Sequence, residues 1–169
     1  RGEGYMDLSE QDLKKIKSLH VMLKMPIWIL ERETNRVLKS YKSIYKHPIS
    51  YEFKEKNISD EVVQFYSGML NEIFLCLWYQ DVRIVIGAFR INNVTSTEFS
   101  HVYDNLTPEN KKILSEKECW EYYSSLPVYP LGDIRDYLIL LGFLFDMNLE
   151  EIYSEELHKQ VTENQLELV

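Results

Sequence analysis

The sequence predicts an α+β domain in which an antiparallel sheet of about five strands is flanked by helices. Residues 72–90 contain two apolar runs rich in β-branched and aromatic side chains, and residues 79–81 between them predict a tight turn. A second hairpin is predicted over residues 27–41, with its turn at residues 33–35. Capped amphipathic segments before and after these hairpins predict the helices.

Composition limits the classes of function that this chain can have. The 169 residues suffice for one ordinary domain, and the 45% apolar content excludes a disordered chain. The net charge of −8 argues against direct nucleic-acid binding by this segment, because duplex binding depends on a basic surface. The sequence shows neither a signal peptide nor an apolar run of about 18 residues, so we expect a cytoplasmic protein without a membrane span.

In the first half, Ser9 with Asp12 predicts the N-terminus of an amphipathic helix that ends before Pro26. Residues 43–55 are aromatic and irregular, and they predict a loop leading into a short edge strand, because Pro48 cannot donate a hydrogen bond to a sheet. Ser59 then predicts the N-cap of a helix that continues to about Leu70.

In the second half, residues 92–97 predict a polar loop, and Thr107 before Pro108 predicts a helix start. Ser115 with Glu118 predicts a further helix that stops before Pro127. Beyond it, we expect Asp133 to cap a helix extending to residue 145. This helix is apolar almost all round, so we expect burial against the sheet, a partner subunit or both.

The chain ends are expected to differ from the domain between them. We expect residues 1–5 to be an expression remnant, and residues 6–153 to form the domain. Residues 154–169 predict a connector helix for dimerisation. Five residues at coiled-coil spacing indicate its seam: Tyr153, Leu157, Val161, Asn164 and Leu168.

No catalytic, metal or cofactor signature is present in the sequence, which predicts that the chain is not an enzyme. Cys76 and Cys119 lack a CxxC pair or a nearby histidine, so buried free thiols are expected. Gly87 is a single glycine rather than part of a phosphate-binding loop, and it predicts a kink at a strand end where the backbone approaches something closely.

The aromatic content suggests a ligand site on one face of the sheet. Tryptophan and tyrosine combine an apolar body with a polar tip that suits amphipathic ligands, although core packing can explain each one. Strand alternation places Phe74, Cys76 and Trp78 on one face and Leu75, Leu77 and Tyr79 on the other, and leaves open which face meets the ligand. The predicted ligand-binding residues are Trp28, Tyr51, Phe74, Cys76, Trp78, Phe89, Tyr123 and Tyr129.

The order of these elements resembles a known family. The strings Met-Pro-Ile-Trp-Ile-Leu (25–30), Ile-Val-Ile-Gly-Ala-Phe (84–89) and Leu-Pro-Val-Tyr-Pro (126–130) carry the resemblance. Over residues 13–153 the chain resembles the N-terminal sensory region of AraC-type transcriptional regulators from low-GC Gram-positive bacteria, in which a PAS/GAF-like domain precedes a helix-turn-helix domain. Gly-Pro-Phe is usual in that family where this chain has Gly-Ala-Phe, so Ala88 replaces a proline.

The resemblance implies a PAS/GAF-like sensor that binds a small-molecule or peptide effector, forms a homodimer and controls transcription through a DNA-binding domain beyond residue 169. Under this hypothesis, a change in the helix over residues 133–145 passes to the C-terminal seam. The predicted dimerisation residues are Tyr137, Leu141, Leu157 and Val161. The alternative is a ligand-free interaction or dimerisation module whose sheet face is filled by its own side chains. A third hypothesis, an enzyme using a tyrosine or histidine in an aromatic pocket, has no sequence signature.

Overall fold

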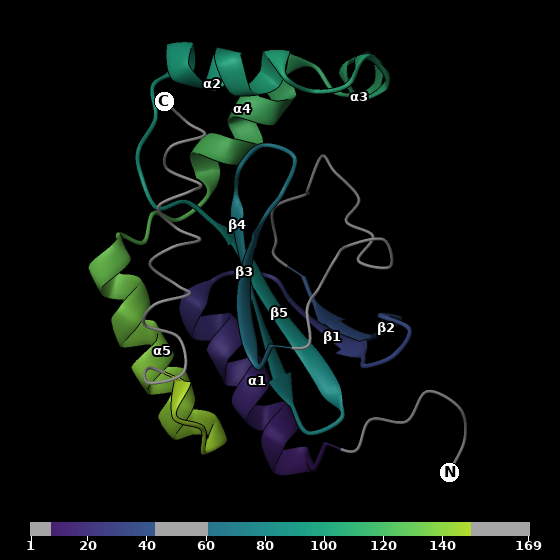
Figure 1. Cartoon of the computed structure of the whole chain (residues 1–169), viewed down its shortest axis with the longest axis vertical. Coiled ribbons are helices and arrows are strands. Elements are labelled where there is room, and N and C mark those ends of the chain that lie inside the picture. Colours follow the sequence, from purple (N-terminus) through teal and green to yellow (C-terminus); the bar gives the residue numbers. More distant parts are fainter. Residues whose placement is uncertain (1–7, 43–60, 150–169) are drawn as a thin grey trace.

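A computed structural model describes residues 8–42 and 61–149 of the chain. Its centre is a five-stranded antiparallel sheet in the order β2-β1-β5-β4-β3, with helices against both faces (Figure 1). The predicted α+β class with about five antiparallel strands is therefore confirmed. The strands are β1 (Ile27–Glu31), β2 (Val37–Tyr41), β3 (Val63–Ser67), β4 (Ile73–Tyr79) and β5 (Val82–Phe89).

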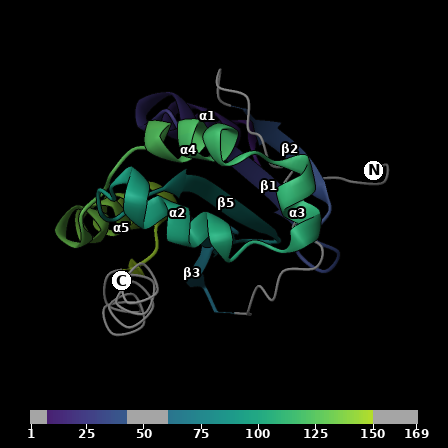
Figure 2. The ribbon, with the colours of Figure 1, turned by 90° about the horizontal axis from the view of Figure 1, so that it is seen from above.

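Two groups of helices cover the two faces of the sheet. One hydrophobic core lies under α1 (Glu10–Leu23) and α5 (Leu131–Phe145). A second core includes side chains of α2 (Ser96–Asp104) and α4 (Glu116–Ser125). The short α3 (Pro108–Ile113) connects α2 and α4 (Figure 2).

The hairpin of β4 and β5 occupies the middle of the sheet, as predicted. All eight residues of β5 are buried, because neighbouring strands flank it on both sides and both of its faces are covered. Leu75 and Leu77 point into the core under α1 and α5. Phe74 and Cys76 point into the other core, so the two sets of side chains lie on opposite faces, as strand alternation predicts, and helices cover both faces.

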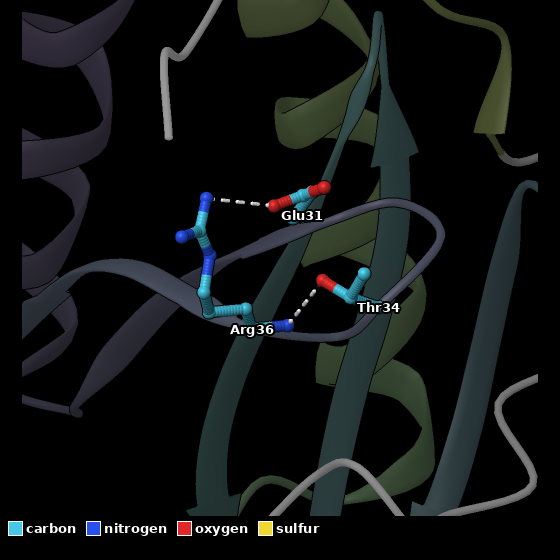
Figure 3. Close-up of polar contacts among 3 residues, drawn as sticks. All are labelled: Glu31, Thr34 and Arg36. Carbon is cyan, nitrogen blue, oxygen red and sulfur yellow. Dashed lines mark hydrogen bonds and ion pairs between the residues drawn. The ribbon is translucent and has the colours of Figure 1, made fainter. Parts of the chain in front are cut away.

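The predicted hairpin of β1 and β2 is also confirmed, and its turn is held by local polar contacts (Figure 3). The Arg36 guanidinium donates to the Glu31 carboxylate at 2.9 Å, and the Arg36 amide donates to the Thr34 hydroxyl at 3.2 Å. Asn35 adopts a left-handed conformation with φ of 56°, which asparagine tolerates well. Because the ion pair is largely exposed, it contributes little to stability.

The predicted helix from Ser59 to Leu70 is wrong, since residues 63–67 form the edge strand β3. Val63 pairs with Leu77 and Phe65 pairs with Leu75, so alternate β3 side chains reach the same core as those of β4. Valine and aromatic residues suit this half-buried position, and pairing with β4 overrides the helical spacing. Ser59 and the predicted edge strand over residues 43–55 lie outside the described residues.

The helix caps were predicted with mixed success. Ser9, Thr107 and Ser115 each accept a backbone hydrogen bond as N-caps, as expected. Asp133 is not a cap, because α5 already begins after Pro130 and places this carboxylate in its first turn. A negative charge there still favours the helix dipole.

The loop expected over residues 92–97 is partly wrong, because α2 begins at Ser96. Thr95 and Glu98 form its capping box, in which each side chain accepts the other's backbone N–H.

Helix α5 is buried on one side and exposed on the other. Ile134, Leu138 and Phe145 pack against the sheet, whereas Leu140 is 63% exposed and Phe143 is 80% exposed. The expectation of burial therefore holds within the chain for one side of the helix. The predicted connector over residues 154–169 lies outside the described residues.

A partly buried hydrogen bond connects α1 to the sheet. The Tyr79 hydroxyl donates to the Asp12 carboxylate at 2.9 Å, and the Tyr79 ring packs on Phe145 of α5. Burial alone would raise the pKa of Asp12, but hydrogen bonds from Tyr79 and Ser9 outweigh it, so the net pKa is lowered. The carboxylate therefore stabilises the fold above its unfolded-state pKa of 3.8, and this contribution is lost as the pH falls through the lower folded-state value.

We predict that Tyr79→Phe lowers the free energy of unfolding by about 1 kcal/mol at pH 7, and that the loss is smaller at pH 3, because the bond is strongest to an ionised carboxylate. Urea denaturation at both pH values measures this difference. Tyr103→Phe is the control, since the Tyr103 hydroxyl donates to a backbone carbonyl and its loss should not depend on pH in this range. An equal loss for Tyr79→Phe at pH 7 and pH 3 would contradict the prediction.

Candidate ligand-binding cavity

An apolar cavity of about 260 Å³ lies between α1, α5 and the sheet. Its floor consists of buried side chains from three neighbouring strands, Phe65 of β3, Leu75 of β4 and Ile86 of β5. These residues share a face because alternate side chains of a strand point the same way. The remaining lining residues are Leu19, Met22, Leu23, Met25, Phe89, Tyr129, Ile134, Tyr137, Leu140, Leu141 and Leu144.

The two helices form opposite walls of the cavity. Leu19 and Leu23 of α1 are one helical turn apart, and Ile134, Leu141 and Leu144 lie along one side of α5. Met22 of α1 and Leu140 of α5 also line the cavity, but they are 80% and 63% exposed. They therefore mark the rim, where the cavity meets the surface.

Tyr129 and Tyr137 supply the hydroxyl groups of the lining. Their rings lie 4.7 Å apart, and the Tyr129 ring also lies 5.7 Å from the ring of Phe89. The Tyr129 hydroxyl donates a long hydrogen bond of 3.5 Å to the carbonyl of Leu23, and it also lies beside the Tyr137 hydroxyl. Burial, followed by the neighbouring Tyr137 hydroxyl, raises the pKa of Tyr129 to about 12, so this phenol is uncharged at neutral pH.

The backbone of β5 determines where Tyr129 lies. The Arg90 amide donates to the carbonyl of Pro127 at 2.8 Å, and the Tyr129 amide donates to the carbonyl of Arg90 at 2.7 Å. This short bridge holds the segment between α4 and α5 against the end of β5. The Tyr129 ring is thereby directed into the cavity.

The cavity is suited to holding a small apolar molecule. Its volume exceeds the roughly 150 Å³ that suffices for benzene and is slightly below the range of about 300–1,000 Å³ for drug-sized ligands. None of its lining residues pairs a nucleophile with a general base. Within residues 8–42 and 61–149, no group of three or more His, Cys, Asp or Glu side chains could hold a metal ion.

A larger hollow of about 490 Å³ lies at the C-terminal end of α5. All of its lining residues fall within residues 139–149, so a single segment forms it. Because binding sites for small molecules usually enclose most of the ligand surface, a site walled by several elements is the better candidate. The smaller cavity under α1 and α5 is therefore the candidate functional site.

Two of the predicted ligand-binding residues, Phe89 and Tyr129, line this cavity. Tyr51 lies outside the described residues. The other predicted residues do not line this cavity and belong to the opposite side of the sheet: Trp28, Phe74, Cys76, Trp78 and Tyr123.

The residues on the opposite face form packed aromatic and cation–π contacts. Phe74 is stacked on Tyr66 with ring centroids 5.2 Å apart and lies 6.2 Å from the ring of Trp28. A Cβ atom at Gly87 would lie 2.7 Å from Phe74 Cδ1, which confirms the close backbone approach predicted at this glycine. Phe74 has no exposed surface and serves the core in this arrangement.

Trp78, Cys76 and Tyr123 are likewise buried. Two guanidinium groups lie over the Trp78 ring, that of Arg83 at 3.8 Å and that of Arg32 at 4.4 Å. Burial raises the pKa of the Cys76 thiol to about 12, although Arg83 and Tyr66 act in the opposite direction. Both Cys76 and Cys119 are buried and free, as the sequence predicts.

Two of the four predicted dimerisation residues lie in the described part of the chain, and both are on α5. Leu141 is 3% exposed and packs within the chain, and Tyr137 lines the cavity. Leu157 and Val161 lie outside the described residues.

The sequence did not predict most of the residues that line the cavity, because their leucine and isoleucine side chains have the same spacing as ordinary core positions.

Comparison with known proteins found no matching family model, no matching curated protein and no matching solved structure. In the part of the chain that the structure describes, no helix has the length and apolar character needed to cross a bilayer. The interpretation of the site therefore depends on its own geometry.

We predict that Leu75→Phe changes the free energy of unfolding by less than about 0.5 kcal/mol, because the larger ring can extend into the cavity. Leu77→Phe is the matched control, since Leu77 lies on the same face of β4 but does not line the cavity. Overpacking at such a position typically costs about 1–3 kcal/mol. Urea denaturation of both variants measures the difference, and an equal loss in the two would contradict the presence of usable space beside Leu75.

Proposed function

We propose that this chain is a ligand-sensing domain in which a small molecule binds between the sheet, α1 and α5. The apolar cavity of about 260 Å³, one wall of which is α5, is the observation that supports this function best. The lining offers a binding surface rather than reactive groups, which favours a binding protein over an enzyme. An interaction module with a fully packed sheet would have no need for such a cavity.

Helix α5 is the element that we expect to respond to the ligand. Ile134, Leu141 and Leu144 contact the cavity along one side of this helix, and α5 is followed by the C-terminal residues 150–169. A ligand that fits one position of α5 better than another shifts the population toward that position. Equal affinity for both positions would transmit nothing.

We further propose that the ligand state controls transcription. This part of the proposal depends on the resemblance to the sensory region of AraC-type regulators, in which the domain acts as a homodimer next to a helix-turn-helix domain. The net charge of −8 agrees with a segment that does not itself contact DNA. In this proposal the protein is cytoplasmic, and its DNA-binding domain follows residue 169.

A second candidate function, self-association without a ligand, is favoured by a specific observation. The described residues include six exposed large apolar side chains, and four of them lie on α1 and α5, namely Val21, Met22, Leu140 and Phe143. Met22 and Leu140 both lie at the rim of the cavity, and neighbouring exposed apolar side chains are typical of an interface. A second copy of this chain is the partner that this hypothesis requires.

The sensing function predicts that a ligand protects α5. A compound from a metabolite panel that raises the melting temperature, as binding to the native state must, should also slow amide hydrogen exchange in α5. Exchange in α3, which has no buried residue and does not line the cavity, should not change. A compound that binds in the cavity while leaving α5 exchange unchanged would contradict transmission through this helix.

Self-association predicts that Phe143→Asp converts a dimer into a monomer, because a carboxylate in an apolar contact is strongly unfavourable. Ile113→Asp is the matched control, since Ile113 is 75% exposed on α3, away from α1 and α5. Sedimentation equilibrium of the two variants and the parent chain measures this. An unchanged molecular mass for Phe143→Asp would exclude this surface as the interface.

A further inference from the structure

The lining of the cavity under α1 and α5 contains no charged side chain. All fourteen lining residues are apolar except for the two tyrosines, in a chain whose overall charged content is 27%. The tyrosines lie side by side with ring centroids 4.7 Å apart. The cavity therefore has apolar walls with hydroxyl groups concentrated at one place.

We propose that the ligand of this cavity is an uncharged, largely apolar molecule with one hydroxyl or carbonyl group that hydrogen-bonds to the Tyr129 and Tyr137 hydroxyls. This inference depends on the proposed sensing function, because it names the chemical class of the molecule that is sensed. It excludes, as effectors, ligands that would have to bury a carboxylate, ammonium or phosphate group inside the cavity.

The exclusion of ions follows from the cost of desolvation. Moving a carboxylate or an ammonium group out of water is strongly unfavourable unless a partner of opposite charge or several hydrogen bonds compensate for it. The lining supplies no opposite charge. Its two tyrosine hydroxyls are neutral dipoles, which offset only a small part of the cost of desolvating an ion. A charged group could bind only by remaining in water outside the rim formed by Met22 and Leu140.

The polar end of the ligand follows from the geometry of Tyr129. Its hydroxyl lies beside that of Tyr137 and donates to the Leu23 carbonyl over 3.5 Å, which is at the weak limit for a hydrogen bond. A ligand oxygen at a normal distance near 2.8 Å would be a better acceptor for this proton. A phenol that also accepts a hydrogen bond can receive one from a ligand hydroxyl, so an alcohol satisfies both roles.

The experiment uses three molecules with the same eight-carbon chain, 1-octanol, octanoate and octylammonium. Each competes at pH 7 with N-phenyl-1-naphthylamine, an uncharged fluorescent probe whose emission rises in apolar sites. We expect the probe to bind and 1-octanol to displace it. Octanoate and octylammonium should need at least about tenfold higher concentration, because the charged groups cannot be desolvated in this cavity.

Two tyrosine variants test the polar end. Tyr129→Phe should weaken 1-octanol binding about five- to tenfold through the loss of one hydrogen bond, with the probe affinity of the same variant measured separately and used to calculate the 1-octanol affinity. Tyr103→Phe is the matched control, because Tyr103 is on α2 and does not line the cavity. Equal affinity of Tyr129→Phe and the parent chain for 1-octanol would overturn the proposed polar contact.

The outcomes separate this inference from the sensing function on which it depends. Displacement by octanoate or octylammonium as effective as by 1-octanol would overturn the ligand class while leaving a functional cavity. Leu75→Phe should reduce probe binding by filling the same space, and Leu77→Phe should not. Absence of probe binding, or binding unaffected by Leu75→Phe, would overturn both the ligand class and the use of this cavity.

Discussion

The Arg90 guanidinium joins the end of β5 to the C-terminal end of α4. It is 8% exposed at the end of β5, and it donates to the carbonyl of Ser124 at 3.2 Å and to that of Leu126 at 3.0 and 3.2 Å. These carbonyls lie at the C-terminal end of α4, where helical backbone groups lack partners within the helix. Charge-assisted hydrogen bonds offset the cost of burying the cation. The chain can then pass from the helices of one face to α5 on the other.

The hairpins and most helix caps could be predicted because their causes are local. Ser9, Thr107 and Ser115 accept hydrogen bonds from residues three positions away, so a short window contains both partners. The same logic was available for α2, whose capping residues are Thr95 and Glu98. β3 could not be decided locally, because its residues fit helical spacing as well as alternation. Pairing with β4 decides in favour of a strand.

The site was only partly predictable, for a physical reason. Aromatic side chains were selected as ligand contacts, but Trp28, Phe74 and Trp78 are occupied in packed rings and cation–π contacts. The cavity is instead lined mainly by leucine and isoleucine, whose spacing is the same whether the space beyond them is filled or empty. The contact of Arg90 with Leu126 was equally inaccessible, since it joins residues 36 positions apart through a backbone carbonyl.

Helix α5 lines the cavity with one side and exposes apolar side chains on the other. Its residues Leu141 and Leu144 contact the cavity, whereas Phe143 is directed outward and Leu140 lies at the rim between the two. A ligand that shifts this helix must therefore move an exposed apolar surface at the same time. If that surface binds a second copy, linkage requires the two equilibria to affect each other equally, so association must change ligand affinity by the factor by which ligand changes association. Ligand binding and dimerisation would then be coupled to each other through the position of α5.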